Sequence, residues 1–397
     1  MLKDGTTAGE WQERVGWLLA AVLLAVIVFG YLMPLTGYFT AVPGDFADAR
    51  YNSMVLEHHY RVFTGGYDAG LWNPDFYYPF KGVLAFSENC LGSAAVYVLA
   101  RLAGLPREHA FDVWFILGTL LNFAAALYVL RRLALSTAAA AIGAFFFTFA
   151  LPVTAQDAHA QLVYRFAAPL AMLALWQMFE RRRLAGFARV AFFTVWQFYC
   201  SIYLGVFLVY LLAALSVAIL IVRRPFEWPQ WRANLAAERL PSKLGAAGLL
   251  LVSLLAFAYL SGNYVLISRT YNLWRPVEAI TELLPRLGSY LMADNSPLLS
   301  WLGRDVSVKG RWEHQMFIGF GAAALIVSAI VWRRRAAVPG LTQAMLIALA
   351  LLVAGTLWIN EFSLYYLITW LPGVDAIGVA GSGAHEARRR PRRPRQQ

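Results

Sequence analysis

The sequence predicts an all-α protein, a polytopic transmembrane helical bundle. Of its 397 residues, 59% are hydrophobic and only 14% are charged, whereas soluble domains are about 45–50% apolar and about 25% charged. Apolar runs of about 17 to 22 residues recur along the chain, and about 20 helical residues cross a hydrocarbon core about 30 Å thick. These observations exclude a soluble globular enzyme.

About nine apolar runs are candidate membrane-spanning helices. The stretch 90–105 is too short to span, so we expect a helix lying flat on the outer surface, as one of the interfacial helices of a large first loop. The basic turns Arg131–Arg132, Arg181–Arg183, Arg223–Arg224 and Arg333–Arg335 then share one side with the N-terminus. The positive-inside rule makes that side cytoplasmic. The expected spans are about 16–36, 109–130, 135–153, 166–180, 185–203, 206–222, 246–264, 315–332 and 341–358.

The expected domain organisation is one transmembrane core, residues 1–358, followed by two unusual segments. Residues 359–380 look like an incomplete further segment, and 381–397 form a basic tail rich in Arg and Pro. The abrupt change in composition predicts that this tail is out of frame or truncated, with further helices missing. A basic tail that binds lipid headgroups is the alternative.

The net charge of +11 does not indicate a nucleic-acid partner. The final thirteen residues hold six Arg and one Glu, and much of the remaining positive charge lies in the short basic turns. The only two cysteines, Cys90 and Cys200, indicate no disulfide framework. The partner predicted by this charge is the membrane itself.

Three outer segments, about 37–108, 154–165 and 265–314, are where chemistry is expected. The first begins with Asp45 and Asp48, three residues apart. If a helix starts near Asp45, this spacing places both carboxylates on one face, where they could bind a metal or act as base and orienting group. Alternatively, Asp45 caps that helix and Asp48 is a first-turn acid stabilised by the helix dipole.

The rest of the first outer segment carries candidate substrate-binding side chains. Its aromatic run suits carbohydrate stacking, or alternatively the membrane headgroup boundary, where amphipathic aromatic residues collect. The candidates are Arg50, His58, His59, Arg61, Trp72, Asn73, Tyr78 and Lys81.

The other two outer segments add possible metal ligands and cations. Asp157 and His159, together with Asp45, could hold a divalent ion such as Mg, Mn or Zn, although a polar loop cap explains the pair equally well. Arg165, Arg269 and Arg275 are outer-side cations that would suit an anionic substrate such as a lipid phosphate, or are solvated loop charges. Glu313, at the entrance of a later helix, is a weaker candidate.

The order of these features resembles the GT-C superfamily of membrane glycosyltransferases. Four motifs resemble an uncharacterised bacterial GT-C-like group, over about residues 10–375: Gly44-Asp45 to Asn52, Leu56-Glu57-His58, Trp72-Asn73 to Pro79, and His159-Ala160-Gln161-Leu162. The spacing of the first acids, D-x-x-D, departs from the superfamily's commoner D-x-D or E-x-D. The superfamily pattern therefore leaves open which Asp is the base.

The resemblance implies an enzyme of the bacterial inner (plasma) membrane that transfers a sugar from a polyprenyl-phosphate donor to a lipid or glycan acceptor on the outer face. It implies Asp48 as the preferred base, Asp45 and Asp157 as metal ligands, and Arg269 or Arg275 as phosphate partners. Two alternatives stay open: a non-enzymatic lipid or glycan carrier or transporter, and a degenerate, truncated GT-C scaffold. A carrier predicts polar groups along a path through the bilayer, whereas here they concentrate outside.

Overall fold

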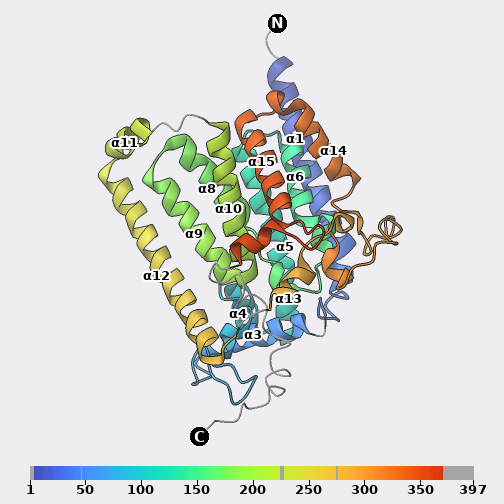
Figure 1. The fold of residues 1–397 in the computed structure, drawn as a ribbon, viewed down its shortest axis with the longest axis vertical. Coiled ribbons are helices and arrows are strands. Elements are labelled where there is room, and N and C mark those ends of the chain that lie inside the picture. The colour runs from blue at the N-terminus through green and yellow to red at the C-terminus, as the bar shows by residue number, and fades with distance from the viewer. Residues whose placement is uncertain (1–3, 46, 224–227, 274–275, 370–397) are drawn as a thin grey trace.

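The computed structural model describes residues 4–45, 47–223, 228–273 and 276–369, and within these ranges it contains helices and no β-strand. Long helices form a bundle, and α3 and α4 lie at the end of the bundle opposite the N-terminus (Figure 1). The longer helices are α1 (Asp4–Ile27), α3 (Asp48–Phe63), α5 (Arg107–Arg132), α6 (Thr137–Phe149), α8 (Ala167–Arg181), α9 (Leu184–Cys200), α10 (Ile202–Val222), α11 (Trp228–Ala237), α12 (Leu240–Tyr271), α14 (Phe320–Trp332) and α15 (Pro339–Thr356). The shorter ones are α2 (Met33–Leu35), α4 (Ala94–Leu102), α7 (Leu151–Thr154) and α13 (Val277–Leu283).

Seven helical stretches are long and apolar enough to cross a membrane, as in a multi-pass membrane protein. They are Gly9–Leu35, Arg107–Arg132, Thr137–Thr154, Ala160–Arg181, Ile202–Val222, Leu240–Tyr271 and Pro339–Thr356. Two further expected spans, 185–203 and 315–332, are the helices α9 and α14, which have only 17 and 13 residues. At 1.5 Å per residue they are about 26 and 20 Å long.

Helix α12 differs most from the sequence-based expectation. It has 32 residues, about 48 Å, and continues well past the expected end near residue 264. Polar side chains interrupt the hydropathy there without ending the helix, because Ser261, Asn263 and Thr270 each donate a hydrogen bond to the carbonyl four residues earlier. The expected third outer segment therefore begins later than predicted, and Arg269 lies in the last turn of α12.

The basic turns lie at one end of the bundle. Glu13 in α1 accepts hydrogen bonds from Arg131 and Thr137, so the start of α1 lies beside the turn between α5 and α6. Similarly, Arg223 at the end of α10 pairs with Glu180 at the end of α8. The first outer segment lies at the opposite end, where the Lys81 carbonyl accepts a hydrogen bond from Tyr271 at the end of α12 (Figure 1).

The stretch 90–105 contains α4, whose nine residues are about 14 Å long and too short to span a membrane. Both α3 and α4 pack on α5 over a core that includes the fully buried Leu56, Tyr97, Phe111 and Trp114. Buried Glu57 of α3 reinforces this packing by accepting hydrogen bonds from Tyr97 and Arg101. The first outer segment is thereby packed onto the bundle, and the start of α3 has a defined position. The tail segment 381–397 lies outside the described residues.

This arrangement predicts that Tyr78 and Arg132 lie on opposite sides of the membrane. Tyr78→Cys and Arg132→Cys are suitable reporters, because both side chains are exposed whereas the native Cys90 and Cys200 are buried. In intact cells, a membrane-impermeant maleimide should label Cys at position 78, and should label position 132 only after permeabilisation. Labelling of both positions from one side would contradict the arrangement, and the unsubstituted chain controls for background.

Candidate functional site

The first and second outer segments meet at Gly44. Its φ is +100°, and an added Cβ would lie 2.7 Å from the Ala49 Cβ and 3.3 Å from the Ala158 carbonyl oxygen. A side chain at this position would therefore both strain the backbone and collide with its neighbours. The absence of a Cβ lets the start of α3 lie against residues 157–161.

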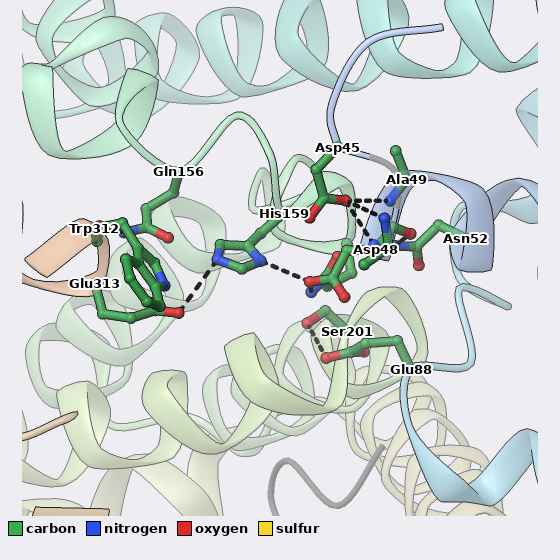
Figure 2. Close-up of polar contacts among 12 residues, drawn as sticks. Asp45, Asp48, Ala49, Asn52, Glu88, Gln156, His159, Ser201, Trp312 and Glu313 are labelled. Atoms are coloured by element: carbon green, nitrogen blue, oxygen red, sulfur yellow. Dashed lines mark hydrogen bonds and ion pairs between the residues drawn. The ribbon is translucent and has the colours of Figure 1, made fainter. Parts of the chain in front are cut away.

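Asp45 caps helix α3. Its Oδ1 accepts hydrogen bonds from the main-chain N–H groups of Ala47, Asp48 and Ala49, at 3.0, 2.6 and 3.2 Å (Figure 2). The first N–H groups of a helix have no partner within it, and a carboxylate also interacts favourably with the helix dipole. The capping alternative predicted for Asp45 is thus the arrangement that the structure shows.

Asp48 is held by two side chains from the second outer segment. Its Oδ2 accepts a hydrogen bond from His159 Nδ1 at 2.6 Å and another from Gln161 Nε2 at 2.7 Å (Figure 2). The bond from His159 is the main cause that lowers the Asp48 pKa below its usual value. Asp48 is therefore an ionised carboxylate with a fixed orientation and a half-exposed side chain.

His159 lies between two carboxylates. Its Nε2 is 3.5 Å from Oε1 of Glu313, which arrives from the third outer segment (Figure 2). The hydrogen bonds to Asp48 and then Glu313 raise the His159 pKa from 6.5 to about 10, and the His159 bond in turn lowers that of Glu313. At neutral pH the cluster is carboxylate, imidazolium and carboxylate, and it joins all three outer segments.

Buried amides keep this cluster in place. Asn52, one turn after Asp48, donates from Nδ2 to Gln161 Oε1 at 2.8 Å and to the Asp48 carbonyl at 2.7 Å. Cys90 donates its thiol hydrogen to Asn52 Oδ1, with sulfur and oxygen 3.2 Å apart. The orientation of Gln161, and through it of Asp48, is therefore set inside the protein.

Glu88 lies close to the cluster and is fully buried (Figure 2). It caps helix α10: its carboxylate accepts hydrogen bonds from Ser201 Oγ at 3.0 Å and from the N–H groups of Ile202 and Tyr203 at 2.7 and 3.2 Å. Burial raises its pKa to about 7 despite these bonds. The pattern of charges in the sequence did not single out this residue, because its role depends on a helix more than 100 positions away.

A cavity of about 180 Å³ opens beside His159. It lies between the helical turn that follows α1, α5, the α6–α7 region, the segment before α8, and α10, and most of its lining is apolar. Asp157, in its wall, accepts a hydrogen bond on Oδ2 from the Tyr31 hydroxyl at 2.9 Å. Arg165 and Thr148 belong to the same wall.

Both adjacent histidines of α3 have structural contacts. His58 Nε2 donates to the Leu71 carbonyl at 2.8 Å, and His59 Nε2 donates to the Asn89 carbonyl at 2.6 Å. Burial lowers both pKa values, that of His59 to about 4, so both rings are neutral at pH 7. They tie α3 to the first loop and lie apart from the cluster around Asp48.

The remaining residues predicted to bind substrate are dispersed. Trp72 donates from Nε1 to the Tyr259 hydroxyl at 2.9 Å, and Asn73 accepts the Gly82 N–H at 2.8 Å, so both help to attach the loop to α12 and to itself. Tyr78 is 92% exposed. In α3, Arg50 follows Asp48, and Arg61 lies 3.6 Å from Glu57. The main chain of Lys81 contacts Tyr271, and Arg269 lies in the last turn of α12. Arg275 lies outside the described residues.

The three side chains predicted to bind a metal are engaged separately. Asp45 caps α3, Asp157 is bonded to Tyr31, and both ring nitrogens of His159 face carboxylates. Within the described ranges, no three His, Cys, Asp or Glu side chains converge as metal ligands. The three predicted ligands are therefore not brought together at one point in the described structure, and metal binding stays a prediction.

The described residues therefore form an all-helical structure with several helices long and apolar enough to cross a membrane. The partly exposed cluster of Asp48, His159 and Glu313 lies at one end of the bundle. The chain belongs to a family described as a domain of unknown function, DUF6311, whose sequence model matches residues 73–368. That range contains His159, Gln161 and Glu313, whereas Asp45 and Asp48 precede it. No curated protein and no solved structure matches the chain.

The raised pKa of His159 predicts a pH-dependent stability. Below about pH 6.5 His159 is protonated in both the folded and the unfolded chain, so its ion pairs contribute fully to the free energy of unfolding. Between pH 6.5 and about 10 only the folded protein keeps the proton, and the contribution is lost progressively. The advantage of wild type over His159→Gln in thermal unfolding should shrink by about 1 to 2 kcal/mol across this interval. A difference that stays constant with pH would contradict the charged cluster.

Proposed function

We propose that this protein is an integral membrane glycosyltransferase that transfers a sugar from a polyprenyl-phosphate donor to a lipid or glycan acceptor on the extracytoplasmic face. The observation that carries the proposal is the Asp48 carboxylate, held ionised by His159 and Gln161, where His159 also lines a cavity within the helical bundle. An oriented carboxylate is the group that such a transfer needs as a base.

Asp48 has the geometry of a general base. Its Oδ2 receives both hydrogen bonds, and within the described part of the chain no group donates to Oδ1. Oδ1 can therefore accept the proton of an acceptor hydroxyl. As that proton leaves, the acceptor oxygen bonds to the anomeric carbon, and the bond from this carbon to the donor phosphate breaks with its electron pair going to the phosphate.

The low pKa of Asp48 is compatible with this role. In a transition state with oxocarbenium character, the acceptor hydroxyl becomes strongly acidic as its oxygen bonds to carbon, so a weak base suffices. His159, which is protonated and held from the other side by Glu313, acts by keeping Asp48 ionised and oriented. The half-exposed Asp48 then returns its proton to solvent.

The extracytoplasmic location is inferred from the distribution of charge. The cluster lies at the end of the bundle opposite the turns that carry Arg131 and Arg223. Arginine-rich turns favour the cytoplasm. This supports a cytoplasmic N-terminus and a site that faces outward, the orientation expected if the chain has the GT-C-like architecture and bacterial inner-membrane location that we propose.

The proposal predicts that Asp48→Asn removes turnover while Asp45→Asn preserves it. The amide at position 48 cannot accept the proton as a base, so sugar transfer from a radiolabelled polyprenyl-phosphate sugar to an envelope acceptor should fall by about 10²- to 10⁴-fold. Asp45→Asn is the matched control, because Asn caps a helix about as well as Asp. Asp45→Asn should unfold at a temperature close to that of the wild type, whereas Asp48→Asn should unfold at a lower temperature because His159 loses its ion pair with Asp48. Turnover is therefore compared at a temperature at which both purified variants are folded.

A folded Asp48→Asn variant that keeps full turnover would exclude Asp48 as the base. If the wild type turns over no donor sugar, and lipid binding is the same in all three proteins, the transferase proposal fails. A lipid or glycan carrier, or a degenerate scaffold, would then explain the fold.

A further inference from the structure

Arg165 brings a positive charge into the bundle without a carboxylate to neutralise it. Among the described contacts, its guanidinium donates to the Leu162 carbonyl at 3.2 Å and the Thr148 carbonyl at 2.9 Å, and lies 5.7 Å from the centre of the Phe147 ring. It forms no ion pair with any described acidic side chain. A charge removed from water at such a position is costly unless an opposite charge compensates it.

Two polar groups in the cavity wall also have no protein partner. The Thr148 hydroxyl, on a residue that is 2% exposed, and Nε of Arg165 are both shielded from solvent and make no hydrogen bond within the described structure. Both residues line the cavity beside His159. Buried donors are normally satisfied, so a pair of unsatisfied donors at one cavity indicates a ligand with acceptor atoms.

Asp157 does not supply the missing counter-charge. It lines the same cavity, but its Oδ2 is bonded to the Tyr31 hydroxyl and it forms no ion pair with Arg165 in the described contacts. The other nearby carboxylates, Asp48 and Glu313, flank His159. The anionic partner of Arg165 is therefore not found in the described part of the chain, which is consistent with a bound anion.

We propose that this cavity binds the phosphate group of a lipid, and that the side chains of Arg165 and Thr148 shift slightly on binding so that Arg165 Nε and the Thr148 hydroxyl reach the phosphate oxygens. Arginine binds phosphate through several N–H groups at once. The rest of the lining, which includes Phe115, Phe149 and Leu204, is apolar and suits the first carbons of the attached chain. The cavity volume of about 180 Å³ leaves room for a phosphate group and a short part of the attached chain.

This inference rests on the proposed function, because it locates the phosphate of the donor lipid within the same site. The phosphate would lie beside His159, and Nδ1 of the same ring donates a hydrogen bond to Asp48. The sugar attached to that phosphate would then project toward the base. A lipid phosphate and free inorganic phosphate share the same anionic chemistry, so the test must separate them.

Thr148→Val provides the sharpest test. Valine keeps the shape of threonine, and the hydroxyl has no partner in the described structure, so its removal should leave the unfolding temperature unchanged or slightly raised. Geranyl phosphate should stabilise the purified wild type against heat, and its affinity should fall about five- to tenfold in Thr148→Val. Thr194→Val on α9 is the matched control, because that hydroxyl bonds the Val190 carbonyl within its own helix.

The probes distinguish the two sources of phosphate. Geranyl phosphate should bind more tightly than inorganic phosphate, and geraniol, which lacks the charge, should bind weakly. Equal affinity for inorganic and geranyl phosphate would overturn the lipid assignment. Arg165→Gln should abolish binding. If that variant does not fold, the comparison of Thr148→Val with Thr194→Val decides, and equal affinity in those two variants would overturn the proposal.

These experiments distinguish a failure of the proposed phosphate site from a failure of the proposed transferase activity. Asp48→Asn should still bind geranyl phosphate although it has lost turnover, because position 48 is outside the cavity lining. One outcome is that the wild type turns over a donor sugar but Thr148→Val binds geranyl phosphate as tightly as the wild type does. That outcome would overturn the phosphate site and leave the transferase proposal intact. Binding that depends on Thr148 without turnover of any donor would overturn the transferase and support the inference.

Discussion

The structure depends on how a non-helical stretch of main chain is satisfied inside a helical bundle. Between α7 and α8 the chain leaves regular helix, and membrane-buried backbone groups need partners from the protein. Asn122 on α5 donates to the Val163 carbonyl at 2.7 Å and accepts the Arg165 N–H, while Gln197 on α9 donates to the Tyr164 carbonyl at 2.7 Å. These buried amides hold the segment that carries His159, Gln161 and Arg165.

Electrostatics at this end of the bundle follow from that support. His159 stays protonated because carboxylates from two other segments approach its ring nitrogens, and Asp48 stays ionised because His159 and Gln161 donate to it. Each charge is stabilised by groups that are far away in the sequence. The result is one oriented carboxylate next to His159, which lines a cavity whose wall also contains Arg165, and the proposed function rests on these two features.

The order and position of most helices could be read from hydropathy, because a membrane span must be both long and apolar. The predicted helix ends are wrong where a helix and its apolar run do not end at the same residue. Helix α12 continues past its apolar part, since Ser261 and Asn263 satisfy their hydroxyl and amide groups against the helix itself. Helix α14 begins later than its apolar run, with Gly319 at φ +86° just before it. Hydropathy records the environment of a segment, whereas helix ends depend on local hydrogen bonding.

By itself, the sequence determined an all-helical chain with membrane-length apolar segments, basic turns kept apart from the acidic first outer segment, and Asp48, Asp157 and His159 as residues of interest. Only the tertiary structure decided that His159 pairs with Asp48 and that Asp157 pairs with Tyr31. Gln161 and Glu88 acquire their roles in the same way. The physical reason is that hydropathy is a property of each segment, whereas a hydrogen bond across more than 100 positions exists only after the helices have packed.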